Sequence, residues 1–236
     1  MKKILTVILL FGVFSAKAQT FSFPKLPVGL VSVSAVKPEN WRIIDVVHGD
    51  LNSDNLEDLA IVLESNVITD EKRAYGDADT ELIKEHQKPR ILAIYFKNTT
   101  GKYTLTVQNN DFILRAEEGG KMGDPFKKVG IANNKLLIAF EGGANWRWKL
   151  NYQFKYLNKQ WLLVQANNTY YHAVSGEMTD KKYDFTTKKV KETEGNLFIN
   201  PEENKTTEKD LKFTYQRTFL NFKKPWTWQI SEDNFL

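Results

Sequence analysis

The chain of 236 residues contains no cysteine, and this absence excludes several kinds of stability and chemistry. Disulfides cannot hold the fold together, and no thiolate is available as a metal ligand, a nucleophile or a site for lipid attachment. Histidine is also scarce, with only His48, His86 and His172, so we expect no zinc site built from three histidines. Stability must come from the packed core, with or without a bound metal ion.

Long apolar runs are missing except near the N-terminus. Two lysines at positions 2 and 3, an apolar stretch over 4–14 and the tripeptide Ala-Lys-Ala ending at residue 18 form the three parts of a secretory signal in order. We predict that residues 1–18 are a signal peptide cleaved before Gln19. The apolar stretch is shorter than the roughly 20 residues that cross a bilayer. We therefore expect an exported protein, periplasmic or secreted, with no membrane span after cleavage.

A strong excess of one charge is also missing from the rest of the chain. The formal charge of +4 includes Lys2, Lys3 and Lys17 of the predicted signal, and the other basic residues nearly balance the 29 acidic ones. Binding of nucleic acid needs a clustered basic face, and none stands out, so we expect no nucleic-acid partner. The partner is otherwise unknown, and an extracellular glycan or protein ligand is the open alternative.

Aromatic residues make up 13% of the chain, and many short stretches alternate apolar and polar residues, which favours β structure. We predict one β-rich domain over 19–236 that is all-β, mainly antiparallel, and either a sandwich or a strongly curved sheet with long hairpins. The strands expected before residue 142 are 43–47, 59–63, 90–97, 103–108, 129–132 and 135–141.

The clearest alternation begins at Trp146 and ends at Tyr156, where every second side chain is aromatic or leucine and the others are polar. The pair Asn158 and Lys159 suits a two-residue turn, and a second strand is expected over 160–171. The segment therefore predicts a long hairpin whose aromatic face lies in the core.

Two regions fit this pattern less well. Residues 65–89 are polar and predict a surface insertion with a short helix over 80–85, capped by Asp79. The C-terminal region 172–236 predicts a small hairpin of strands 183–186 and 189–193. After it we expect a polar loop over 194–210 and a strand-like aromatic segment over 211–230.

One candidate site lies between the first two expected strands, in an acidic loop. Oxygen-bearing side chains stand at its first, third, fifth and ninth positions, and the backbone carbonyl of the seventh is available. These residues are Asp50, Asn52, Asp54, Leu56 (carbonyl) and Asp58. Ca²⁺ takes six to eight oxygen ligands, which alternate residues of a curled loop can supply, whereas Mg²⁺ demands a stricter octahedron. The loop therefore predicts a structural Ca²⁺ site. Residue 61 is isoleucine where a helix-loop-helix calcium hand needs glutamate, which disfavours that motif.

The loop resembles the FG-GAP, or integrin-propeller, type of calcium loop, in which D-x-[DN]-x-D-G-x-x-D precedes an apolar strand. The match runs from Gly49 to Val62 and departs from the pattern at Asn55, where the family has glycine. The resemblance implies a calcium loop between two strands. Propellers contain typically 4 to 8 blades, so a single copy does not imply a propeller.

A wider resemblance covers more of the chain. The acidic loop, a Gly-Asp-Pro-Phe stretch at 123–126, a Gly-Gly pair at 142–143 and Trp-Arg-Trp at 146–148 occur in this order. This order is similar to that in a group of uncharacterised secreted bacterial proteins. The resemblance implies a common fold and brings no known activity.

The predicted function is that of an exported β-domain that acts structurally or in binding, and three alternatives remain open. The acidic loop could be an ordinary turn rich in Asp and Asn that binds no metal. A carbohydrate-binding or adhesion module would expose Trp146, Trp148, Trp226 or Trp228 as a platform. A hydrolase of extracellular polymers would need carboxylates from distant segments, such as Asp124 and Glu141, to converge. No G-x-S-x-G or S-x-x-K pattern is present, so no catalytic residue is assigned.

Overall fold

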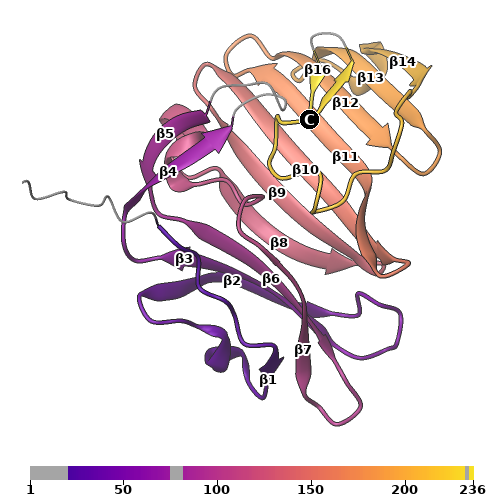
Figure 1. Ribbon diagram of the computed structural model, residues 1–236. Coiled ribbons are helices and arrows are strands. Elements are labelled where there is room, and N and C mark those ends of the chain that lie inside the picture. Colours follow the sequence, from indigo (N-terminus) through magenta and orange to yellow (C-terminus); the bar gives the residue numbers. More distant parts are fainter. Residues whose placement is uncertain (1–20, 75–81, 232–233) are drawn as a thin grey trace, which may run out of the picture.

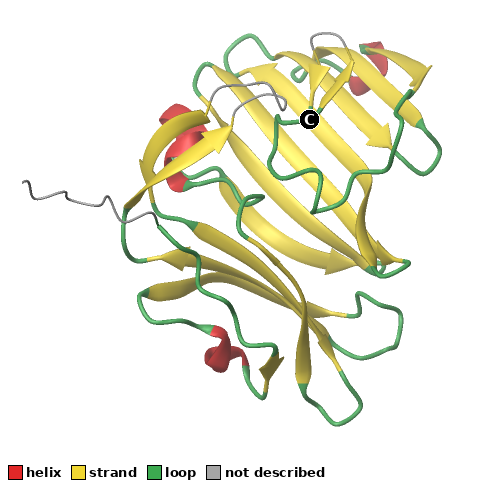
Figure 2. Cartoon of the chain, viewed as in Figure 1, coloured by secondary structure: helices red, strands yellow, loops and turns green. Residues whose placement is uncertain are grey.

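The computed structural model describes residues 21–74, 82–231 and 234–236. The predicted signal peptide lies outside this part of the chain. Strands dominate the described residues and pair in antiparallel fashion, which confirms the predicted all-β class (Figure 2). Each of the six strands expected before residue 142 lies within an observed strand.

Two large sheets form the body of the protein (Figure 1). The five-stranded sheet has the order β1 (Gly29–Leu30), β7 (Tyr103–Asn109), β6 (Arg90–Lys97), β3 (Asp58–Ser65) and β2 (Trp41–Gly49). The seven-stranded sheet has the order β14 (Lys205–Asp210), β13 (Lys189–Asn196), β12 (Glu177–Asp184), β11 (Gln160–His172), β10 (Trp146–Leu157), β9 (Lys135–Gly143) and β8 (Phe126–Ala132). The seven-stranded sheet curls strongly (Figure 1). This matches the strongly curved sheet, one of the two architectures predicted from the sequence.

The long hairpin predicted from alternation is β10 and β11. Asn158 and Lys159 connect the strands with φ angles of +50° and +61°, the conformation of the two-residue turns that match strand twist. Leu150, Tyr152 and Phe154 are almost fully buried on the core face. The alternation therefore predicted the buried face, and the turn residues predicted where the hairpin reverses.

Strand β3 is buried on both faces, which explains why its sequence is continuously apolar. Ala60 and Val62 contribute to a core that also contains β9, β10 and β11 side chains of the seven-stranded sheet. Leu59, Ile61 and Leu63 contribute to a second core on the other face, which the N-terminal segment covers with residues such as Leu26, Leu30 and Val36.

The insertion over 65–89 contains a hairpin of β4 (Thr69–Ala74) and β5 (Leu82–Gln87). The predicted helix is wrong over residues 82–85, which lie in β5, and Asp79 falls outside the described residues. Pairing across the hairpin supplies the backbone hydrogen bonds that a helix would have made locally.

The C-terminal predictions are partly wrong. The predicted small hairpin is present as β12 and β13, but its first strand lies earlier than predicted, since β12 ends at Asp184 and residues 185–186 are in the turn. Residues 194–210 are not all loop, because β13 continues to Asn196 and β14 forms an edge strand. Residues 211–228 contain no named strand. Instead Phe219, Phe222 and Trp228 pack in the core between the sheets. These aromatic residues therefore contribute packed side chains to the core, and their backbone is not part of a named strand. A short strand pair, β15 (Gln229–Ser231) and β16 (Asn234–Phe235), follows.

Helical structure in the described residues is limited to short 3₁₀ turns: η1 (Val33–Val36), η2 (Ala116–Met122) and η3 (Pro201–Glu203). None of the helices in that part of the chain has the length and apolar character needed to cross a membrane.

Candidate functional site

The predicted cation loop closes the hairpin between β2 and β3, where Gly49 pairs with Asp58. Leu51 is buried in the core between the sheets. From the other sheet, the side-chain amide of Asn134, in the β8–β9 turn, donates to the backbone carbonyl of Asp50 at 3.0 Å. The loop therefore contacts both sheets at once.

Successive side-chain oxygens accept hydrogen bonds from backbone N–H groups two residues further along the loop. Asp50 Oδ1 accepts from Asn52 at 3.2 Å, Asn52 Oδ1 accepts from Asp54 at 3.0 Å, and Asp54 Oδ1 accepts from Leu56 at 2.8 Å. The amide of Asn52 also donates to Asp54 Oδ2 at 2.9 Å. This series curls the loop, because each bond turns the backbone back over the preceding side chain.

The loop requires two residues in the left-handed region of backbone conformation. Asn55, where the resembling family has glycine, has a φ angle of +64°, and Asp50 Oδ2 accepts from its N–H at 3.0 Å. Asparagine tolerates this region better than most residues. Ser53 also has a positive φ, of +67°, which the sequence did not predict.

Asp58 differs from the other predicted ligands because its side chain is fully buried. Its carboxylate accepts from the Leu51 N–H at 2.8 Å and from the Lys97 N–H, at the end of β6, at 2.9 Å. Burial raises the pKa of Asp58, and the negative charges of Asp54 and Asp50 raise it further, although the two N–H donors oppose this shift. Three carboxylates therefore lie close enough to repel one another.

The predicted ligands only partly resemble a metal site. Within the described residues, no group of three or more His, Cys, Asp or Glu side chains is arranged to hold a metal ion. The predicted ligand set also includes the amide oxygen of Asn52 and the carbonyl of Leu56. Each carboxylate or carbonyl oxygen has two lone pairs, so one that accepts an N–H can also face a cation. The calcium site therefore stays a prediction from the loop residues.

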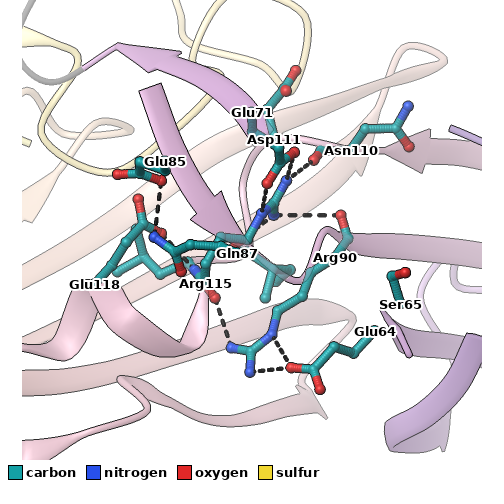
Figure 3. Close-up of polar contacts among 12 residues, drawn as sticks. Glu64, Ser65, Glu71, Glu85, Gln87, Arg90, Asn110, Asp111, Arg115 and Glu118 are labelled. Carbon is teal, nitrogen blue, oxygen red and sulfur yellow. Dashed lines mark hydrogen bonds and ion pairs between the residues drawn. The ribbon is translucent and has the colours of Figure 1, made fainter. Parts of the chain in front are cut away.

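A second polar cluster, which the sequence did not predict, lies where the two sheets meet at the end of β3 (Figure 3). Arg90 and Glu64 are 1% and 2% exposed, and Arg90 Nε donates to Glu64 at 2.8 Å. The Arg90 guanidinium also donates to the Leu114 carbonyl and to both carboxylate oxygens of Asp124. Arg42 donates to the other oxygen of Glu64. Each buried charge is therefore paired and hydrogen-bonded, which such burial requires.

The neighbouring Arg115 is fully buried and binds Glu71 through two parallel hydrogen bonds of 2.8 and 2.9 Å (Figure 3). Because Glu71 lies in β4 and Arg115 precedes η2, this pair fixes the insertion to the body of the protein. Lys224 and Glu118 form a further buried pair, which fixes the C-terminal segment to η2.

Asp124 gives this cluster a pH dependence. Burial by itself would raise the pKa of Asp124, but the hydrogen bonds and the charge of Arg90 outweigh it and lower that pKa below its ordinary value of 3.8. A carboxyl with a lowered folded-state pKa stabilises the fold above its unfolded pKa, and this contribution disappears as the pH falls through the folded-state pKa.

We therefore expect Asp124→Asn to be less stable than wild type at neutral pH, and expect the difference to shrink at acid pH. Urea unfolding at a series of pH values measures the difference in unfolding free energy. It should be constant from about pH 7 to pH 5 and decrease below about pH 4, where the unfolded carboxyl takes up its proton. A difference that stays unchanged down to about pH 3 would contradict the pairing with Arg90.

The tryptophans named for the alternative carbohydrate-binding platform do not share one environment. Trp228 is buried, and Trp148 packs edge-on against Trp226 with ring centroids 4.6 Å apart beside the core. Trp146 is 39% exposed and stacks on Tyr170 with an interplanar angle of 4°. Of these four tryptophans, Trp146 is exposed, Trp148 and Trp226 are half-buried, and Trp228 is buried, so they do not form one uniformly exposed platform.

The carboxylates named for a hydrolase have different partners. Asp124 binds Arg90, whereas Glu141 accepts from the Tyr171 hydroxyl at 3.2 Å and lies 3.7 Å from Lys149. The N–H of Glu141 donates to the Pro125 carbonyl at 2.9 Å, so the two segments adjoin, but each carboxylate is hydrogen-bonded to a side chain of its own.

Comparisons with known proteins give no relative: no family model, curated protein or solved structure matches the chain. The FG-GAP-like resemblance therefore remains a prediction from the loop residues.

Proposed function

We propose that this protein is an exported β-domain in which the loop over 50–58 binds Ca²⁺ and thereby stabilises the contact between the two sheets. The observation that carries the proposal is the series of side-chain turns at Asp50, Asn52 and Asp54, which curls the loop. Asp58 adds a buried carboxylate whose charge is unfavourable without a counter-ion.

The ligands in this proposal are the side-chain oxygens of Asp50, Asn52, Asp54 and Asp58 and the carbonyl of Leu56. A bound Ca²⁺ supplies positive charge, which offsets the repulsion among the three aspartates. Because the loop contacts Asn134 of the seven-stranded sheet and Lys97 of the five-stranded sheet, holding its shape supports both. The role is structural, and a ligand of the domain binds elsewhere.

We expect excess Ca²⁺ to raise the melting temperature relative to a chelator. A ligand at about 100 times its Kd adds about 2.7 kcal/mol to the unfolding free energy, which corresponds to roughly 5–10 °C in a domain of this size. Mg²⁺ at the same concentration should give a smaller increase, because it demands stricter octahedral geometry. Differential scanning calorimetry of the wild type in each ion makes this comparison.

Two variants with the same change in charge separate ion binding from general electrostatics. Asp54→Asn retains an oxygen that can accept the Leu56 N–H but loses a ligand charge, so most of the gain from Ca²⁺ should disappear. Glu57→Gln removes a charge from an exposed side chain of the same loop that is not a proposed ligand, so the gain should remain. No gain in wild type, or equal gains in the two variants, refutes the site.

A further inference from the structure

The seven-stranded sheet carries a hollow of about 810 Å³ on its polar face, opposite the core. All seven strands contribute to its lining, from Lys128 of β8 to Glu208 of β14. The volume falls within the roughly 300–1,000 Å³ of typical ligand pockets. We call this hollow the polar trough.

The centre of the trough is one row of side chains that crosses the whole sheet. Strand pairing places each member directly opposite the next, in the order Lys128, Ala139, Asn151, Asn167, Lys182, Lys191 and Glu208. A neighbouring row contains Leu137, Gln153, Gln165, Asp184 and Lys189. Four side-chain amides therefore form a block on β10 and β11, with lysines beside it.

The amide block contains side-chain donors and acceptors that make no hydrogen bond within the described residues. Gln165 and Asn167 donate to Asp184 and Asp180. The hydrogen bonds of the described residues include none from the side chain of Asn151, and Gln153 uses only its oxygen, which accepts from Lys135. A side-chain amide has N–H donors and an oxygen acceptor, and a sugar hydroxyl can accept from the former and donate to the latter.

The lysines of the central row are only loosely neutralised. Lys182 and Lys191 stand directly opposite each other, a placement that disfavours folding for two like charges. Their carboxylate neighbours, Asp180 and Glu208, lie 3.6 Å away in each case, beyond normal hydrogen-bond distance. An anionic group between the two lysines would relieve their repulsion.

From these observations we infer that the polar trough binds an acidic saccharide, with its hydroxyls on the amide block and its carboxylate or sulfate between Lys182 and Lys191. The acidic residues of the lining support binding rather than hydrolysis. Asp184 accepts from the Thr186 and Thr187 N–H groups and from Gln165, and Glu208 lies between Lys189 and Lys191. This inference does not depend on the calcium loop.

The test titrates the ¹⁵N-labelled full chain with three oligosaccharides of equal length: one built from uronic acids, one sulfated and one neutral. We expect at least one acidic probe to shift the side-chain amide signals of Asn151 and Asn167 and to bind more weakly at high salt. The carboxylated and sulfated probes distinguish the two sources of the negative charge. Absence of binding by both, or equal binding of the neutral probe, overturns the inference.

Two variants test whether the acidic probe binds in the polar trough. Lys182→Ala should weaken the acidic probe about tenfold, the effect of losing about 1.4 kcal/mol from a charged hydrogen bond. Asn151→Ala should weaken it about threefold, as expected for a neutral hydrogen bond. The control, Lys205→Ala, removes an exposed lysine from the opposite face of the same sheet and should leave the affinity unchanged. If neither Lys182→Ala nor Asn151→Ala changes the affinity for the acidic probe, the inference is also overturned.

Discussion

Replacing Arg90 by methionine is expected to lower the unfolding free energy by about 3–5 kcal/mol, because it leaves buried charge without its partner. Glu64 is 2% exposed and would keep only Arg42, whose side chain is 59% exposed. The Leu114 carbonyl would lose one hydrogen bond to Arg90, and Asp124 would lose two. In a domain of this size the melting temperature should fall by roughly 6–20 °C.

A double variant separates the cost of an unpaired charge from the value of the pair. Arg90→Met combined with Glu64→Leu removes both charges and leaves apolar side chains of similar volume, a change that is often neutral or stabilising for buried pairs. We expect the double variant to be more stable than Arg90→Met alone. Chemical denaturation of the two single variants and the double variant gives the coupling energy.

The control for this series is Asp70→Asn. Asp70 lies 2.7 Å from Lys84, but the two side chains are 50% and 67% exposed, so water screens their attraction. No measurable change in melting temperature is expected. If Arg90→Met proves as harmless as Asp70→Asn, the buried cluster does not stabilise the fold as proposed.

The ion cluster also shows what sequence reasoning could not reach. Arg90 begins an apolar strand and looks like an exposed end residue, while Glu64 stands one residue before the end of another such strand. Their pairing follows from the register of β3 against β6, which joins residues 26 positions apart. A local pattern predicts the strands, but it does not contain this register.

The contacts of the candidate sites also fall into two groups: those that a local sequence pattern predicts and those that depend on the fold. The curl of the acidic loop was predictable, since Asp50, Asn52 and Asp54 each bind a backbone N–H two residues away. The bond from Lys97 to Asp58 was not, because it crosses 39 residues. The polar trough was also missed, since Asn151 and Lys182 follow the ordinary alternation of a solvated strand face. The pairing of neighbouring strands brings these side chains into one row around the hollow.

The prediction for the C-terminal segment was wrong for a different reason. Its aromatic residues suggested a strand, because aromatic side chains are enriched in strands. Phe219 and Phe222 instead fill the space between the two sheets, where burial and not pairing decides the conformation. Sequence composition identified an aromatic segment but predicted neither its burial nor how its backbone runs.

Phe112 joins this segment to the sheets, and Phe112→Ala should be among the most destabilising single substitutions in the protein. Its side chain is fully buried. Four aromatic rings surround it edge-on with centroids 5.2 to 5.5 Å away: Tyr152, Phe154, Phe219 and Phe222. Truncation removes the apolar contacts and leaves a cavity that these rings can fill only in part, at a cost of about 3–5 kcal/mol.

Two comparisons test whether this cost comes from packing. Phe112→Leu keeps most of the apolar volume and should lose less unfolding free energy than Phe112→Ala. Phe198→Ala makes the same chemical change at a side chain that is 67% exposed, where an effect within about 0.5 kcal/mol is typical. Urea unfolding of the three variants should therefore rank Phe112→Ala lowest, Phe112→Leu in the middle and Phe198→Ala nearest wild type. If Phe112→Ala equals Phe198→Ala, Phe112 does not organise the core, because a cavity among four rings cannot form without loss of contacts.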